Sequence, residues 1–306
     1  MKDRINFSKA FLPCAIISLV LIVGGVVGLF VRGINFGIDF RPGMIEEVEI
    51  SNAAGIEEVR DALSAFGGVS VKKIGGADSS FYQIRSGISE DDSQITDALN
   101  AKYGAANVSV QKTDFIGSSM SASLARNSIL LLLGTMVLIW LYATVRFHWD
   151  FALGAIIALI HDIFIMFTFI IWSQLEFSTT VLAAVLTIVG YSINATVVIL
   201  DRVRYNLPLM EVKKFGEILD QSLTDTLTRS IITTATTFFA VLALYIFTTG
   251  SIKDFALAMM VGLLSGFYSS IFISSGFINL TRRNWKSEFG FHHALPKKPA
   301  QTVVVG

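Results

Sequence analysis

Six long apolar runs constrain the fold of this chain more than any other feature of its sequence. The runs cover residues 10–32, 128–146, 150–172, 177–200, 230–249 and 254–280. Each is long enough to cross about 30 Å of hydrocarbon as a helix. Only 16% of the 306 residues are charged, against roughly 25% in a typical soluble domain. The sequence therefore predicts a polytopic α-helical membrane protein with six transmembrane helices.

Lysine and arginine are distributed unevenly between the connections of these runs. Fourteen lie at residues 1–9, in the turn after the second run, at 201–229 and at 281–306. They are Lys2, Arg4, Lys9, Arg146, Arg202, Arg204, Lys213, Lys214, Arg229, Arg282, Arg283, Lys286, Lys297 and Lys298. The two short connections on the opposite side contain only Lys253. Because cytoplasmic loops are enriched in Lys and Arg, we expect both termini to be cytoplasmic.

The long connection, residues 33–127, then lies outside the cytoplasm. Its pattern predicts strands at 44–50, 69–74, 80–85 and 107–113, and helices at 53–66, with Ser51 or Asn52 as its cap, and at 90–103. This order is that of a ferredoxin-like α+β domain. Residues 33–120 carry thirteen acidic and seven basic side chains, a net charge of −6, which suits a soluble domain rather than one that binds anionic lipid. The segment contains no His and no Cys, so we expect a binding or lever domain without chemistry.

Composition and motifs exclude several classes of function. The 24 basic and 24 acidic residues balance, so no overall field favours a nucleic-acid partner. The one cysteine, Cys14, lies inside the first apolar run and cannot form an intrachain disulfide. No phosphate-binding glycine loop, nucleophile–base pair or metal signature occurs. We therefore expect neither an enzyme nor a cofactor.

Polar residues inside the apolar runs require an explanation, because a charge in mid-membrane costs about 2.5–3.5 kcal/mol. His161 and Asp162 lie at the centre of the third run. Asp162 is a candidate proton carrier; the alternative is an interhelical hydrogen bond that fixes packing. His161 and Thr168, seven residues apart, share one helix face.

The fourth and fifth runs carry polar stripes. Thr187, Tyr191 and Asn194 lie on one face beside Gly190, whose small size admits a neighbouring backbone. In the fifth run the stripes contain Arg229, Ser230, Thr233, Thr234, Thr236 and Thr237. These threonines can instead bond to their own helix, and Arg229 can extend toward the membrane surface. We expect the third, fourth and fifth runs to enclose a polar core.

The sixth run contains a seam of small residues, Gly262, Ser265, Gly266, Ser269 and Ser270, which predicts a close helix–helix contact. Asp201 and Arg202 end the fourth run, where a solvated helix end is the simplest interpretation.

Four segments resemble the SecF family, whose members act with SecD in bacterial protein export, within the wider RND superfamily. Gly37-Ile38-Asp39-Phe40 resembles the family's G-I-D-F-T-G-G segment, and Ala158-Leu159-Ile160-His161-Asp162 resembles its A-L-x-H-D. The most specific match is Gly190-Tyr191-Ser192-Ile193-Asn194 through Asp201-Arg202-Val203-Arg204. The stretch from Ser222-Leu223-Thr224 through Thr228-Arg229 to Thr233-Thr234 supports it. The resemblance covers nearly the whole chain.

The resemblance implies an accessory subunit of the Sec translocase that assists late protein export across the cytoplasmic (inner) membrane, using the proton-motive force. The partners it implies are SecD, the SecYEG channel with SecA, the translocating preprotein and membrane lipid, with YajC as a further candidate. The ion-coupling candidates are Asp162, His161, Asn194, Arg229, Thr233 and Thr237. In the family an aspartate in the fourth span and an arginine in the fifth are linked to proton use, and Arg229 matches the arginine.

The aspartate is absent. Ala195 follows Asn194 where the family signature has Asp, and an alanine cannot bind or release a proton. Three interpretations follow: proton transfer rests on SecD's carboxylates, Asp162 substitutes, or the pair uses another ion or weak coupling. Arg41-Pro42 and Tyr205 are lesser departures from the family pattern. Two rival functions stay open: an RND half-transporter for a lipid or small hydrophobic solute, and a non-conducting structural subunit of the SecD/SecF pair.

Overall fold

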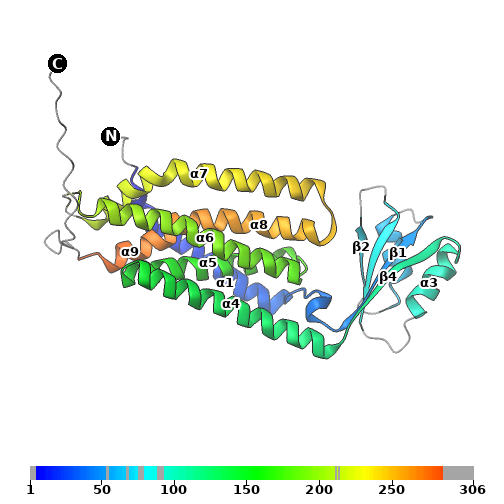
Figure 1. The fold of residues 1–306 in the computed structure, drawn as a ribbon. Coiled ribbons are helices and arrows are strands. Elements are labelled where there is room, and N and C mark those ends of the chain that lie inside the picture. Colours follow the sequence, from blue (N-terminus) through cyan, green and yellow to red (C-terminus); the bar gives the residue numbers. More distant parts are fainter. Residues whose placement is uncertain are drawn as a thin grey trace, which may run out of the picture.

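A helical bundle and a small α+β domain follow each other along the long axis of the molecule (Figure 1). The computed structural model describes residues 5–52, 55–66, 69–74, 79–87, 93–210, 212 and 214–284. The bundle contains α1 (Phe11–Arg32), α4 (Ser118–Arg146), α5 (Trp149–Ser173), α6 (Thr179–Asn206), α7 (Phe215–Phe247) and α8 (Gly250–Ser269). A π-helical turn, η3 (Ser270–Ser274), joins α8 to α9 (Ser275–Thr281). Within the described part, six helical segments are long and apolar enough to cross a membrane, which confirms the expected class.

Several helices extend beyond the apolar runs. The helix α4 begins at Ser118 instead of residue 128, and α7 begins at Phe215 instead of residue 230. The helix α6 ends at Asn206, just before Leu207 and Pro208. Most of the expected connection at 201–229 is therefore helical, as parts of α6 and α7, because hydropathy marks the apolar part of a helix and not where its backbone ends. Pro208 has no backbone N–H with which to continue the helical hydrogen bonds, which accounts for the observed end.

The small domain has the predicted order of elements. Its strands are β1 (Gly43–Ile50), β2 (Ser70–Ile74), β3 (Phe81–Ser86) and β4 (Val108–Ile116), and its helices are α2 (Ile56–Ala62) and α3 (Ser93–Tyr103). The antiparallel sheet has the order β2-β3-β1-β4, which is that of a ferredoxin-like fold. Both helices contribute to its core, where Val59 of α2 and Leu99 of α3 pack against Val48 and Tyr82. The predicted cap was wrong, because Gly55 occupies the N-cap of α2 without a side-chain bond.

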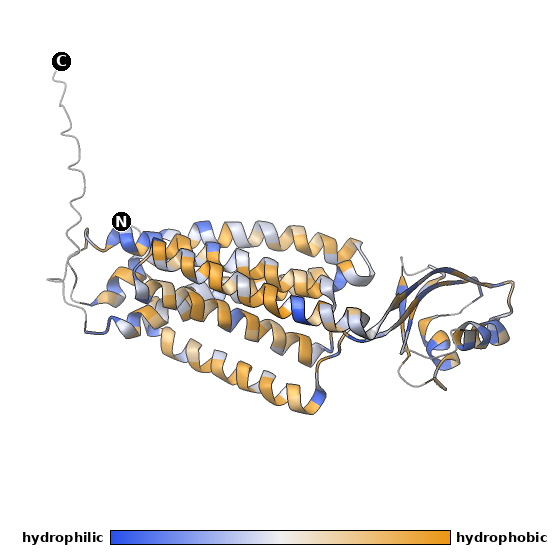
Figure 2. Ribbon diagram, turned by 60° about the horizontal axis from the view of Figure 1, so that its bottom comes forward, coloured by the Kyte–Doolittle hydropathy of each residue, from blue (hydrophilic) through white to orange (hydrophobic). Residues whose placement is uncertain are grey.

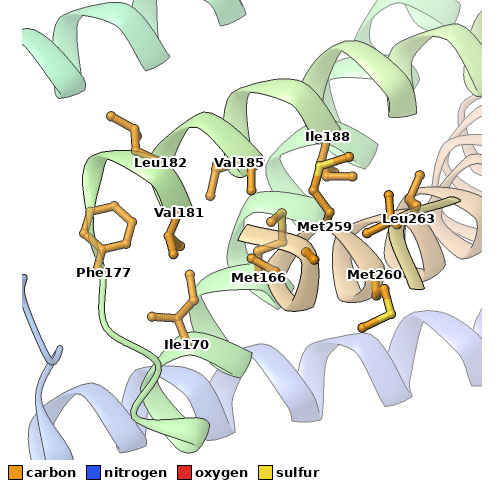
Figure 3. Close-up of a cluster of buried hydrophobic side chains, with 14 residues drawn as sticks. Met166, Ile170, Phe177, Val181, Leu182, Val185, Ile188, Met259, Met260 and Leu263 are labelled. Carbon is orange, nitrogen blue, oxygen red and sulfur yellow. The ribbon is translucent and has the colours of Figure 1, made fainter. Parts of the chain in front are cut away.

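The membrane bundle is held together by α5, α6 and α8. Met166 and Ile170 of α5 meet Val185 and Ile188 of α6 and Leu263 of α8 in one buried cluster (Figure 3). A Cβ atom at Gly262 would lie 2.4 Å from Cγ1 of Ile188, so only glycine allows α8 to approach α6 this closely. The predicted close contact of the small-residue seam is confirmed.

The outer faces of α1 and α4 are apolar. Figure 2 shows α1 as predominantly hydrophobic, and α4 as hydrophobic beyond a more hydrophilic beginning next to the small domain. Leu138 and Val145 of α4 are 68% and 90% exposed, and Phe30 of α1 is 84% exposed. Surfaces of this kind suit contact with lipid acyl chains.

Candidate functional site

Asp162 is fully buried between three helices and surrounded by hydroxyl donors. Ser192 of α6 donates to its Oδ2 at 2.6 Å, and Ser269 of α8 donates to the same oxygen at 2.7 Å. Ser265 of α8 donates to Oδ1 at 2.6 Å. A hydrogen bond to a charged group contributes about 1.5–3 kcal/mol, so three such bonds offset much of the cost of placing a carboxyl group here. The polar groups of α5, α6 and α8 therefore satisfy one another inside the chain.

A chain of hydrogen bonds links Asp162 to α1 through His161. His161 Nδ1 lies 3.2 Å from Oδ1 of Asp162, and Nε2 lies 3.0 Å from Oγ of Ser18. Ser18 bonds to the Tyr268 hydroxyl at 3.0 Å, and Tyr268 donates to the Cys14 carbonyl at 2.7 Å. His161 and Ser18 are both buried, so this chain runs through the interior of the bundle.

The direction of these hydrogen bonds constrains the protons of the pair. The Cys14 carbonyl can only accept, so Tyr268 donates to it and in turn accepts from Ser18. Ser18 Oγ then accepts from Nε2–H of His161. These donor and acceptor roles, including the hydrogen on Nε2, are assigned from the hydrogen-bond network.

A second polar region lies on the opposite side of α6, in an open groove that faces out of the bundle between α6 and α7. Its volume is about 290 Å³, and its lining includes Tyr191, Asn194 and Ala195 of α6 with Arg229 and Thr233 of α7. Asn194 and Arg229 are exposed. Arg229 forms no salt bridge with any residue that the structure describes.

The expected common core of the third, fourth and fifth spans is therefore wrong. His161 and Asp162 on α5 face α1, α6 and α8, whereas Asn194 and Arg229 form a separate outer groove. The reason is that α8 packs against α5, α6 and α7 and occupies the position expected for the fifth span. The shared face of His161 and Thr168 is confirmed, because both point at α1.

The threonines of α7 bond to their own helix, as the second of the two interpretations predicted. The hydroxyls of Thr233, Thr236 and Thr237 donate to carbonyls three or four residues earlier in the helix. Thr187 on α6 does the same. Tyr191 is different, because its hydroxyl donates to the Thr233 carbonyl at 2.8 Å and links α6 to α7.

The segment around Asp39 joins the small domain to the bundle. Oδ2 of Asp39 accepts from the backbone N–H of Thr179 at 2.7 Å and from its hydroxyl at 2.8 Å. Asp39 thus binds the first residue of α6, where a negative charge favours the helix dipole. The Gly37 N–H donates to the Phe177 carbonyl at 2.9 Å. The family-signature residue Asp39 is therefore placed to fix the beginning of α6.

Ion pairs hold the sheet against the same end of the bundle. Lys72 Nζ of β2 lies 2.8 Å from Glu176, before α6, and 2.8 Å from Asp254 of α8. Arg85 of β3 also pairs with Glu176. Burial lowers the pKa of the Arg85 guanidinium, while the charges of Asp39 and Asp254 raise it. At this junction the basic side chains of the sheet therefore pair with carboxylates near the beginnings of α6 and α8.

At the far end of α6, Asp201 and Arg202 do more than end a helix in solvent. Arg146 lies 2.6 Å from Asp201, and Arg202 lies 2.7 Å from Asp225 on α7. Asn206 also donates to Asp225, at 3.2 Å. These contacts connect α6 to the end of α4 and to α7.

Sequence reasoning missed Ser18, Ser265, Ser269 and Tyr268 as members of the Asp162 network. The serines of α8 were assigned to packing alone, although their i, i+4 spacing places two hydroxyls on one face. Nothing in the local sequence around Ser18 or Tyr268 indicates these contacts, because Ser18 lies 143 positions from His161 and 250 positions from Tyr268. Among the described residues no group of His, Cys, Asp or Glu forms a candidate metal site.

Comparison with known proteins identifies the family. Residues 95–284 match the C-terminal model of the SecD/SecF protein export membrane proteins, and residues 27–54 match the SecD/SecF GG motif. Protein translocase subunit SecF of Treponema pallidum is 32% identical over 92% of this chain and 98% of its own length. Its counterpart in Borreliella burgdorferi is 37% identical over 90% of this chain and 96% of its own length.

A solved structure gives the same result for the fold. The crystal structure of SecDF, a translocon-associated membrane protein from Thermus thermophilus, superposes with a TM-score of 0.80 at 30% identity. The match covers 93% of this chain, which spans only 39% of that longer protein. With six apolar helices, a ferredoxin-like domain and these relatives, the chain belongs to the SecF subunits of the SecD/SecF protein-export family.

Proposed function

We propose that the chain is an accessory subunit of the Sec translocase that acts with SecD and assists late protein export by using the proton-motive force. It resides in the bacterial inner membrane with both termini in the cytoplasm. The small domain lies on the periplasmic side, where it contacts emerging preprotein. The SecYEG channel with SecA is the wider assembly, and YajC is a further candidate partner.

The observation that carries this proposal is the uncovered groove between α6 and α7. An unpaired guanidinium and an amide at Arg229 and Asn194 face outward from helices that cross hydrocarbon. Such groups are costly against lipid and almost always face protein or water. A second membrane chain that covers the groove removes this cost. SecD is the partner of the family, and a SecD carboxylate opposite Arg229 would supply the charge that Ala195 lacks.

The Asp162 network is the candidate for ion use within this chain. Its hydroxyls and imidazole form a continuous path from Asp162 to Ser18, and hydroxyl groups can exchange donor and acceptor roles by rotation. A change in the packing of α8 would remove the Ser265 and Ser269 hydroxyls from Asp162 and so change its surroundings. In this proposal Asp162 is the ion-carrying group of this chain, and the SecD carboxylate is the counter-charge of Arg229.

Movement of the bundle reaches the small domain through the junction. Asp39 holds the beginning of α6, and Glu176 beside it holds Lys72 and Arg85 of the sheet. A shift of α6 or α8 therefore moves the points to which the sheet is attached. Rigid-body motion of this kind is a common form of conformational coupling.

The rival interpretations give different outcomes. A half-transporter for a lipid or small solute predicts a larger outer domain, whereas the described outer domain is a single four-stranded sheet with the helices α2 and α3. A non-conducting structural subunit is favoured by Ala195 and requires only that Asp162 has no role in export. Solute efflux from vesicles that contain the purified chain tests the first rival, and Asp162→Asn tests the second.

The experiment that tests the proposal is replacement of the chromosomal copy by variants, followed by pulse-labelling of a secreted precursor. We expect depletion to slow maturation and Asp162→Asn to slow it as well. Thr187→Val is the matched control, because the Thr187 hydroxyl bonds only to its own helix. Normal maturation after depletion would contradict the export function, and normal maturation with Asp162→Asn alone would return Asp162 to a structural role.

A further inference from the structure

A groove at the end of the bundle that carries both termini is lined by α1, η3 and α9, with the beginning of α7 at its mouth. Its volume is about 760 Å³, within the roughly 300–1,000 Å³ of small-molecule sites. The inner wall is apolar and includes Phe11, Phe272 and Phe277. On the α1 side Leu12 is 71% exposed and Ala15 is also exposed, so the groove opens laterally, toward the lipid.

Three cations lie at the mouth of this groove, and among the described residues none has a partner of opposite charge. Lys9 ends the short η1 helix (Phe7–Lys9), Lys214 is the N-cap of α7, and Arg283 follows α9. All three are exposed, and none forms a salt bridge within the described part of the chain. Arg282 differs, because it pairs with Asp150 and lies over the rings of Phe151 and Phe215.

One of the acids near the beginning of α7 is already satisfied. Asp220 of α7 accepts from the backbone N–H and the hydroxyl of Ser8, both at 2.8 Å. The mouth of the groove therefore presents a net positive charge above an apolar wall. The cationic mouth suits an anionic headgroup, and the apolar wall suits an acyl chain, so the groove matches one amphiphilic molecule.

We infer that this groove binds one anionic phospholipid, with the phosphate at Lys9, Lys214 and Arg283 and an acyl chain against α1 and η3. Each basic residue at a membrane surface contributes roughly 1 kcal/mol toward an anionic lipid. The apolar wall adds burial of the acyl chain, which a free phosphate cannot use. A phospholipid is also the molecule that surrounds the lateral opening at high concentration. The site is separate from both polar regions that the proposed function uses.

The test is lipid binding to the detergent-purified full chain, measured by native mass spectrometry and by thermal unfolding. The probes are dioleoyl phosphatidylglycerol, dioleoyl phosphatidylcholine and inorganic phosphate. We expect one retained phosphatidylglycerol and a raised melting temperature, with neither effect from the other two probes. Equal retention of phosphatidylcholine, or displacement of the lipid by inorganic phosphate, would overturn the inference.

Two variants separate the parts of the groove. Joint Lys9→Gln, Lys214→Gln and Arg283→Gln should weaken phosphatidylglycerol binding roughly 100-fold, which is about 3 kcal/mol at 1.4 kcal/mol per tenfold. The control carries Arg126→Gln, Arg204→Gln and Lys253→Gln, the same charge change at exposed positions outside the groove. Ala15→Trp fills the lateral opening and keeps every charge, and it should also weaken binding. Equal loss in the control, or unchanged binding with Ala15→Trp, would contradict the site.

Discussion

The two polar regions of the bundle differ in how they compensate polar side chains inside apolar helices. Around Asp162, groups from α1, α5, α6 and α8 meet one another, and the carboxyl group is fully buried with three hydroxyl donors. In the groove between α6 and α7, Asn194 and Arg229 face outward and the chain offers Arg229 no described counter-charge. The first region is complete in one chain, and we propose that another chain completes the second.

This contrast teaches that polarity inside a membrane span does not by itself identify a site of ion transfer. The interior network supports the fold of this chain, and the groove does not. Variants of the interior should therefore change the stability of the isolated chain. Variants of the groove should change association and leave that stability almost unaltered.

The largest expected effect is that of Asp162→Ala. Removal of the carboxylate leaves the hydroxyls of Ser192, Ser265 and Ser269 without their acceptor, and loss of one partner of a buried polar network costs about 3–5 kcal/mol. Unfolding of the detergent-purified chain measures it. The control is Asn194→Ala in the groove, which should change stability by less than about 0.5 kcal/mol. Equal losses for the two variants would remove the distinction between the regions.

A smaller effect is expected from adding one methyl group on either side of α6. Gly262→Ala places a Cβ atom 2.4 Å from Ile188 in the interior and should destabilise the chain by about 1–3 kcal/mol. Gly190→Ala meets nothing within 4 Å and removes a flexible glycine from a helix. It should therefore stabilise by up to about 1 kcal/mol. Thermal unfolding of both purified variants decides whether the two faces differ.

Arg229→Gln should leave the isolated chain within about 0.5 kcal/mol of its original stability, because no described salt bridge is lost. Its effect should appear in association with SecD. Co-purification in mild detergent should recover less SecD with Arg229→Gln than with Lys253→Gln, an exposed cation outside the groove. Recovery of the same amount of SecD with both variants would mean that Arg229 does not contribute to binding SecD.

A small change in stability is also expected for Ala195→Asp, which restores the carboxylate of the family signature. Ala195 is half-buried in the same groove as Arg229 and Asn194, so the new charge has polar neighbours and an opening. Stability should stay within about 1 kcal/mol of the original. Membrane fractionation and unfolding measure the result. Complete failure to insert would show that the groove is packed without water and without a partner.

Sequence patterns predicted the class of fold because they depend on local properties. Helical length and apolarity gave six spans, and alternation with glycine breaks gave the order of the small domain. The ends of α4 and α7 were wrong because a helix continues through polar residues such as Asp220 and Thr224 where other segments cover them. The site was predicted only in part, because the position of α8 between α5 and α7 depends on tertiary packing at Gly262 and Gly266. Asp162 was found from its cost in hydrocarbon, but its serine partners were not.

The most direct test of the account places a photo-crosslinking amino acid at Asn194 in cells that produce SecD at its natural level. The control position is Leu138, which is 68% exposed on the apolar face of α4. We predict an adduct between position 194 and SecD, and labelling of lipid from position 138. Labelling of lipid alone from position 194 would contradict the claim that a second chain covers the groove between α6 and α7.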